Sequence, residues 1–109
     1  MTYKEVAAMV KSIGLPFAYY SFPEGTEMAP PFVVYFYTFS DDLMADDINY
    51  QEIPTLNIEL YTAEKDFDLE AAVEAVLKNN GLTYYKEEQF IKSEKMFQIA
   101  YEMEVIING

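Results

Sequence analysis

The stretch Pro-Pro-Phe-Val-Val-Tyr-Phe-Tyr-Thr-Phe, residues 30–39, decides the fold. It predicts a β-strand that is apolar or aromatic on both faces, because successive side chains of a strand point to opposite sides. The even-numbered residues from Phe32 to Phe36 share one face, and the odd-numbered residues from Val33 to Phe39 share the other. One layer of helices covers only one face of a strand. We expect the even-numbered residues under helices, and the odd-numbered tyrosines on the other sheet face or against a neighbouring protein.

The composition predicts one soluble domain over residues 1–109, made inside the cell. The hydrophobic content of 51% excludes a disordered tail. The net charge of −12 disfavours direct binding to nucleic acid or to an anionic membrane surface. The absence of Cys and His excludes disulfides, thiol nucleophiles and imidazole chemistry. The first apolar run, Val6 to Val10, is too short for a signal peptide or a membrane span.

Before residue 40 the pattern predicts a helix and two strands. Thr2 and Glu5 have the spacing of a capping box, and an amphipathic helix follows that ends at Gly14. A short aromatic strand from Phe17 to Phe22 precedes the strand from Phe32.

After residue 52 the pattern predicts a strand, a helix and a hairpin. Apolar and polar residues alternate strictly from Pro54 to Tyr61. Asp66 or Asp68 caps a second helix that ends at Gly81. The strands Leu82 to Phe90 and Phe97 to Val105 form a hairpin. The prediction is an α+β domain of order α-β-β-β-α-β-β, with a mainly antiparallel sheet and two helices packed on one face.

Residues 40–52 are polar and acidic, and we expect a loop with a functional role there. Its acidic side chains are Asp41, Asp42, Asp46 and Asp47. A calcium loop of the EF-hand type needs acids at alternating positions, a central Gly and a distal Glu, and this spacing differs. The sequence therefore favours a solvated or partner-facing acidic loop over a metal site.

Neither a catalytic residue nor a cofactor is predicted. Glu87 and Glu88 are consecutive and point to opposite faces of a strand, and Glu102 and Glu104 alternate like the solvent face of the last strand, so neither pair resembles two acids across a cleft. No Gly-rich phosphate loop is present, and the serines have no histidine to activate them.

The chain has 10 Tyr and 8 Phe, which fit an aromatic core, a subunit interface or a ligand pocket. The pattern yields candidates for a subunit interface at the end of the long strand, in the acidic loop and on the terminal hairpin. These candidates are Phe36, Tyr37, Phe39, Met44, Ile48, Tyr84 and Tyr101.

Short motifs along nearly the whole chain carry a family resemblance. They are Leu15-Pro16-Phe17-Ala18-Tyr19, Pro30-Pro31-Phe32-Val33-Val34-Tyr35, Ile58-Glu59-Leu60-Tyr61-Thr62 with Lys65-Asp66, and Glu94-Lys95-Met96-Phe97-Gln98. Together they resemble small prophage proteins of long-tailed bacteriophages from Gram-positive hosts, namely head-to-tail joining, tail-completion or tail-terminator proteins.

The resemblance implies a non-enzymatic structural protein that assembles as a ring, commonly a hexamer. Such a ring caps the tail tube or joins it to the head, so the expected partners are further copies and the tail tube or connector proteins. The expected location is the virion, after synthesis in the bacterial cytoplasm. A closed ring uses two different patches of each subunit, which would cover the second face of the strand from Phe32.

Two other hypotheses stay open. A small, strongly acidic phage protein could mimic DNA and inhibit a basic host protein. This requires a continuous acidic stripe, whereas the acids cluster only at residues 41–47. A small-ligand-binding domain or carboxylate enzyme rests on the aromatic content alone and requires a pocket that encloses acids with raised pKa values.

Overall fold

The long aromatic strand lies inside a five-stranded sheet in the computed structural model, which describes residues 1–41, 43–45 and 48–108, with backbone only for residues 43–45 and 48–50. The strands, in their order across the sheet, are β1 (Phe17–Tyr19), β2 (Phe32–Ser40), β5 (Pro54–Thr62), β7 (Met96–Glu104) and β6 (Tyr85–Ile91). The pairs β2–β5, β5–β7 and β6–β7 are antiparallel, as predicted. The first strand is the exception, because β1 runs parallel to β2 and ends at Tyr19 rather than at Phe22.

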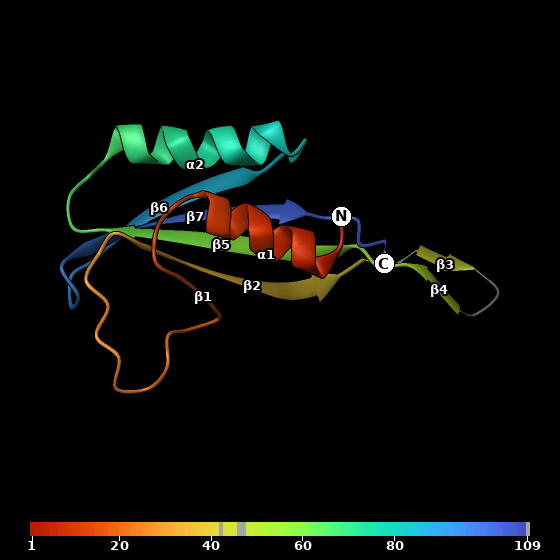
Figure 1. Ribbon diagram of the computed structural model, residues 1–109, viewed down its shortest axis with the longest axis horizontal. Helices are drawn as coiled ribbons and strands as arrows, with labels where there is room; N and C mark the ends of the chain where they lie inside the picture. The colour runs from red at the N-terminus through yellow and green to blue at the C-terminus, as the bar shows by residue number, and fades with distance from the viewer. Residues whose placement is uncertain (42, 46–47, 109) are drawn as a thin grey trace.

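Two helices form the second layer of the domain, and the predicted caps are present. Helix α1 (Tyr3–Ser12) begins with a complete capping box between Thr2 and Glu5. Helix α2 (Phe67–Asn79) begins at Asp66, whose side chain accepts a hydrogen bond from the backbone of Leu69 at 3.0 Å. Both helices lie on the same face of the sheet (Figure 1). The predicted α+β architecture, with its order of helices and main-sheet strands, is therefore confirmed.

The core lies between the helices and one face of the sheet. Its buried members are Val6, Met9, Val10, Val33, Leu56, Ile58, Leu60, Val73, Leu77, Ile99, Tyr101, Met103, Val105 and Ile107. The odd-numbered residues of β2 belong to this face, since Val33 pairs with Leu60 and Tyr35 with Ile58. The predicted orientation of β2 was thus wrong. Both faces of β2 are apolar, so β2 alone does not determine which face is buried. Its neighbour β5 has a single apolar row, and this row pairs with the odd-numbered residues of β2 and places them on the buried face.

The other face of the sheet is called the open face here, because neither of the two described helices covers it (Figure 1). It carries the even-numbered residues of β2 together with Asn57, Glu59 and Tyr61 of β5. Val34 exposes only 6% of its surface, whereas Phe32 and Phe36 are half-buried. The open face is therefore partly apolar near β2.

A second, two-stranded sheet interrupts the predicted acidic loop. It consists of β3 (Leu43–Ala45) and β4 (Ile48–Gln51), which pair antiparallel. This hairpin projects beyond the end of the main sheet (Figure 1). The radius of gyration is 15.0 Å, compared with about 13 Å for a compact domain of this length. The projecting hairpin lengthens the molecule, whose principal extents are 50 × 30 × 22 Å.

The amino terminus is hydrogen-bonded to residues 106 and 108 near the other end of the chain. The amino group of Met1 donates hydrogen bonds to the carbonyl of Ile106 at 2.9 Å and to Oδ1 of Asn108 at 2.8 Å.

In the part of the chain that the structure describes, neither helix is long and apolar enough to cross a membrane.

Candidate functional site

Aromatic side chains gather where β1 lies beside β2, and we call this surface the aromatic edge. It consists of Tyr3, Tyr19, Tyr20, Tyr35, Phe36 and Tyr37, whose rings contact one another in pairs, and of Phe39 near the end of β2. The ring of Tyr19 contacts those of Tyr35 and Tyr37, with centroids 5.2 and 6.1 Å apart. Tyr3, Tyr19 and Tyr20 expose 45%, 53% and 70% of their surfaces. Exposed aromatic groups of this kind mark contact surfaces, because tyrosine buries area and keeps a polar tip.

The backbone of β2 is only partly paired at this edge. The three residues of β1 cover β2 as far as Tyr35, whose carbonyl accepts a last hydrogen bond from the backbone of Tyr20 at 2.8 Å. Beyond Tyr35, none of the described strands pairs with the outer edge of β2. Phe39, which exposes 67% of its surface, lies on this stretch. An exposed strand edge beside apolar rings can receive a strand from another chain.

The predicted interface residues of β2 all lie at this edge. Phe36 is on the open face, and Tyr37 is on the helix side, where its ring meets Tyr3 at 5.2 Å. The hydroxyl of Tyr37 is buried and makes no hydrogen bond with the described residues. Burial, followed by the nearby tyrosines, raises the pKa of Tyr37. Its hydroxyl is therefore protonated at neutral pH.

The two predicted interface residues of the terminal hairpin lie apart from the aromatic edge, under α2. Tyr101 is fully buried, and its hydroxyl donates a hydrogen bond to Oε2 of Glu74 at 2.8 Å. Tyr84 is half-buried, with its ring centroid 5.2 Å from that of Tyr101. Tyr101 is thus a core residue and offers no surface for a subunit contact.

The remaining residues that were predicted for the subunit interface and for the acidic loop belong to the projecting hairpin and its flanks. Met44 lies in β3 and Ile48 in β4, but their side chains are outside the described part of the structure. Asp42, Asp46 and Asp47 are also outside it. Asp41 is exposed, and its backbone donates a hydrogen bond to the carbonyl of Ile53 at 2.8 Å.

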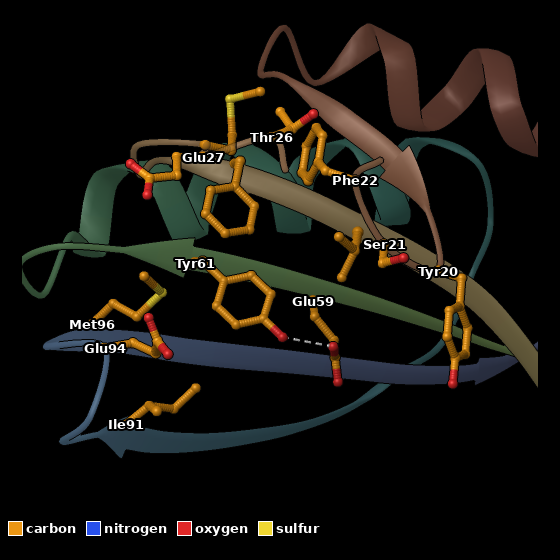
Figure 2. A pocket seen from close by; sticks show the side chains of 13 residues that line it. Tyr20, Ser21, Phe22, Thr26, Glu27, Glu59, Tyr61, Ile91, Glu94 and Met96 are labelled. Atoms are coloured by element: carbon orange, nitrogen blue, oxygen red, sulfur yellow. Dashed lines mark hydrogen bonds between the residues drawn. The ribbon is translucent and has the colours of Figure 1, made fainter. Parts of the chain in front are cut away.

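A groove of about 680 Å³ lies on the open face, next to the aromatic edge. Its floor comes from β2 and β5, where the rings of Phe32 and Tyr61 stack with centroids 4.8 Å apart. Phe22, in the segment after β1, packs edge-on against Phe32 at 5.4 Å and forms one wall. Figure 2 shows the opposite wall, where Glu94 and Met96 come from the turn and the start of β7.

Hydrogen bonds fix the polar part of the groove. Nε2 of Gln98 donates to the hydroxyl of Tyr61 at 2.7 Å. That hydroxyl donates to Oε1 of Glu59 at 2.9 Å (Figure 2). Gln89 extends this chain by donating to Gln98. Burial raises the pKa of Tyr61 to about 12, and the hydrogen bond from Gln98 opposes this shift. Tyr61 therefore keeps its proton and holds the Glu59 carboxylate in place at neutral pH.

A group of charged residues under α2 is a further polar feature. Glu70 exposes 1% of its surface, and its oxygens lie 2.6 Å from Nζ of Lys65 and 2.9 Å from Nζ of Lys86. Lys86 also lies 2.8 Å from Glu74, and Lys65 pairs with Glu88. We call these five residues the charged cluster.

The electrostatics of the charged cluster do not suit acid catalysis. Burial by itself raises the pKa of Glu70 and Glu74. Their lysine partners, joined at Glu74 by the hydrogen bond from Tyr101, outweigh burial, so both pKa values are lowered. A general acid needs the opposite shift. The described residues contain no group of three or more acids placed to hold a metal ion.

Sequence reasoning missed both the groove and the charged cluster. The only local signal for the cluster was Glu70 on the second helix, at a position bordering the apolar stripe. The groove depends on where the segment of residues 20–31 folds back over the open face, and no periodic pattern encodes that path.

Comparison with known proteins gives a fold relationship. No protein-family model and no curated protein matches the sequence. Among solved structures, the chain is similar to one in the "Virion of native gene transfer agent (GTA) particle", with a TM-score of 0.55 and 16% sequence identity. The match covers 94% of this chain and 86% of that chain. At this identity the likeness shows a shared fold along almost the whole domain.

Proposed function

We propose that the protein is a non-enzymatic structural subunit of a phage tail or head-tail junction, and that it assembles as a ring on the tail tube. The observation that carries the proposal is the whole-chain fold likeness to a chain of a virion particle. The prediction made from the sequence motifs, a tail-completion or tail-terminator protein, names the same role.

The aromatic edge supports the assembly part of this proposal. Tyr19, Tyr20 and Phe39 each expose more than half of their surface, although they are large aromatic side chains. They flank the edge of β2 with which none of the described strands pairs, so backbone pairing and ring burial can occur in one contact. We expect Phe36 and Tyr37 to be part of the same contact.

The projecting hairpin supports a second contact. An isolated two-stranded hairpin is marginally stable in water, and β3 and β4 form a sheet separate from the main one. A neighbouring subunit that packs on the hairpin would stabilise it. Two different patches, the hairpin and the aromatic edge, are what a closed ring requires from each subunit. We expect Met44 and Ile48 to contribute to this contact, with Asp41, Asp42, Asp46 and Asp47 at a contact or at the lumen.

The test is the molar mass in solution, measured by size-exclusion chromatography with light scattering over rising protein concentration. We expect masses that are multiples of 12.6 kDa. Phe39→Ser should weaken self-association by about tenfold or more at each contact, because burying a Phe side chain contributes about 1.5–3 kcal/mol.

Phe67→Ser is the matched control, because Phe67 lies on α2 and exposes 73% of its surface, compared with 67% for Phe39. We expect this control to self-associate like the original chain. A chain that stays monomeric and also fails to bind purified tail tubes or connectors would refute the proposal.

The alternative is an acidic inhibitor that mimics DNA. Part of the negative charge is unavailable for such a role, since Glu70, Glu74 and Glu88 are paired with lysines. If a basic host protein is pulled down with this chain at low salt and is released at high salt, this alternative is favoured over the virion role.

A further inference from the structure

The proposed ring contacts do not account for the composition of the groove on the open face. Its lining includes the carboxylates Glu27, Glu59 and Glu94, and none of its lining residues is a lysine or an arginine. The rest of the lining is mainly aromatic and aliphatic, with Phe22, Phe32 and Met96 among its members. The groove therefore combines apolar surface with negative charge.

We propose that this groove binds a short segment of a different virion protein, and that the segment presents a Lys or Arg side chain between apolar side chains. The inference rests on the proposed function, because a junction subunit must contact proteins other than its own copies. The chemistry of such a segment matches that of the groove. Its apolar side chains pack on Phe22 and Phe32, and its Lys or Arg side chain forms ion pairs with the groove carboxylates.

The carboxylate of Glu59 is prepared for such a cation before binding. Tyr61 donates one hydrogen bond to it at 2.9 Å, and Gln98 holds the Tyr61 hydroxyl at 2.7 Å. A carboxylate offers about four acceptor sites, so this single bond leaves capacity for a guanidinium or ammonium group. Groups that are already oriented lose less entropy on binding.

The shape of the groove suits a peptide segment. It has a volume of about 680 Å³, within the range of about 300–1,000 Å³ that is typical of binding sites. It is open to solvent. It lies between the segment of residues 20–31 and the turn before Met96 (Figure 2). A peptide segment can therefore reach it from solvent.

Charge favours a different protein over a second copy of this chain. Each copy carries a net charge of −12, so a second copy approaches the acidic groove against repulsion. The acidic groove attracts a basic segment at long range, and the cation of the bound segment forms an ion pair with a groove carboxylate.

The test is fluorescence anisotropy with a short fluorescein-labelled peptide in which arginine and leucine alternate. Two matched peptides replace arginine by serine or by glutamate. We expect the arginine peptide to bind, and the serine and glutamate peptides to bind at least about tenfold more weakly, since two or more rim charge pairs together supply a factor of that order.

A pair of double variants separates the groove from general attraction. E59Q/E94Q removes two groove charges, whereas E87Q/E104Q removes two charges from exposed positions elsewhere on the open face. We expect E59Q/E94Q to weaken binding of the arginine peptide by about fivefold to tenfold, and E87Q/E104Q by less than about twofold.

Several results would overturn the inference. They are no binding of the arginine peptide, equal binding of the serine peptide, and equal losses in the two double variants. If E59Q/E94Q alters the molar mass in light scattering but not peptide binding, the occupant is a second copy. The ring proposal fails on a different result, which is a monomer that does not bind tail tubes.

Discussion

A single substitution at Lys86 should show how much the charged cluster contributes to the free energy of unfolding. Its Nζ lies 2.9 Å from Oε1 of Glu70 and 2.8 Å from Oε2 of Glu74, so it forms ion pairs with two carboxylates of α2. Lys86→Met keeps the length and the apolar part of the side chain and removes the charge. Glu70 would then keep only Lys65, which lies 2.6 Å away.

The size of the effect follows from the burial of the partners. Breaking a fully buried ion pair costs about 3–5 kcal/mol, and an exposed pair contributes about 0–1 kcal/mol. The Glu70 side chain is 2% exposed, but that of Lys86 is 37% exposed. We therefore expect an intermediate loss of about 2 kcal/mol in the free energy of unfolding. In a domain of this length that lowers Tm by about 8 °C.

The effect should depend on pH in a defined direction. The pKa values of Glu70 and Glu74 are lowered in the folded chain from an ordinary value of 4.5. A carboxylate with a lowered folded pKa stabilises the fold above its ordinary pKa, and this contribution is lost as the pH falls through the folded pKa. The difference between the original chain and Lys86→Met should therefore be largest near neutral pH and should shrink below pH 4.5.

Urea denaturation followed by circular dichroism, repeated from neutral to acidic pH, measures both quantities. Lys78→Met is the matched control, because Lys78 is an exposed lysine in the last turn of α2. We expect it to change the free energy of unfolding by less than about 0.5 kcal/mol. If the two variants lose the same stability, or if the Lys86→Met loss does not vary with pH, the reasoning about the charged cluster is wrong.

Further predictions concern single hydrogen bonds and alkaline pH. Tyr101→Phe removes the 2.8 Å hydrogen bond to Glu74 and should cost about 1.5–3 kcal/mol in thermal or urea unfolding, because the acceptor is charged. Tyr85→Phe, at a side chain that is 81% exposed, should have almost no effect. Thr2→Ala removes the cap of α1 and should cost about 1 kcal/mol in the same assay. The pKa of Tyr61 is raised from 10.0 to about 12, so the unfolded chain ionises first and stability should fall between these pH values. A Tyr61→Phe chain whose alkaline unfolding matches that of the original chain would contradict this last prediction.

Much of the fold follows from local patterns in the sequence. The spacing of Thr2 and Glu5 predicts the start of α1, and the structure has both hydrogen bonds of the capping box. The alternation of Leu56, Ile58 and Leu60 predicts a strand with one buried face, and these side chains are fully buried. These predictions succeed because each depends on residues close together in the chain.

The errors arise where distant segments decide the outcome. Alternation cannot orient β2, since both of its faces are apolar, and pairing with β5 makes the choice. The parallel pairing of β1 depends on the long return of the chain through residues 20–31. Polar composition predicts a loop at residues 40–52, where β3 and β4 instead form a hairpin. Tyr101 shares the apolar row of β7 with Ile99 and Met103, and the packing of this row under the helices makes it a core residue rather than an interface residue.

Electron cryo-microscopy of the purified chain mixed with tail tubes tests directly whether this chain forms the proposed ring. We expect a closed ring of identical subunits at one end of the tube, with the aromatic edge of each subunit against its neighbour. Bare tube ends beside a chain that remains at 12.6 kDa would contradict it.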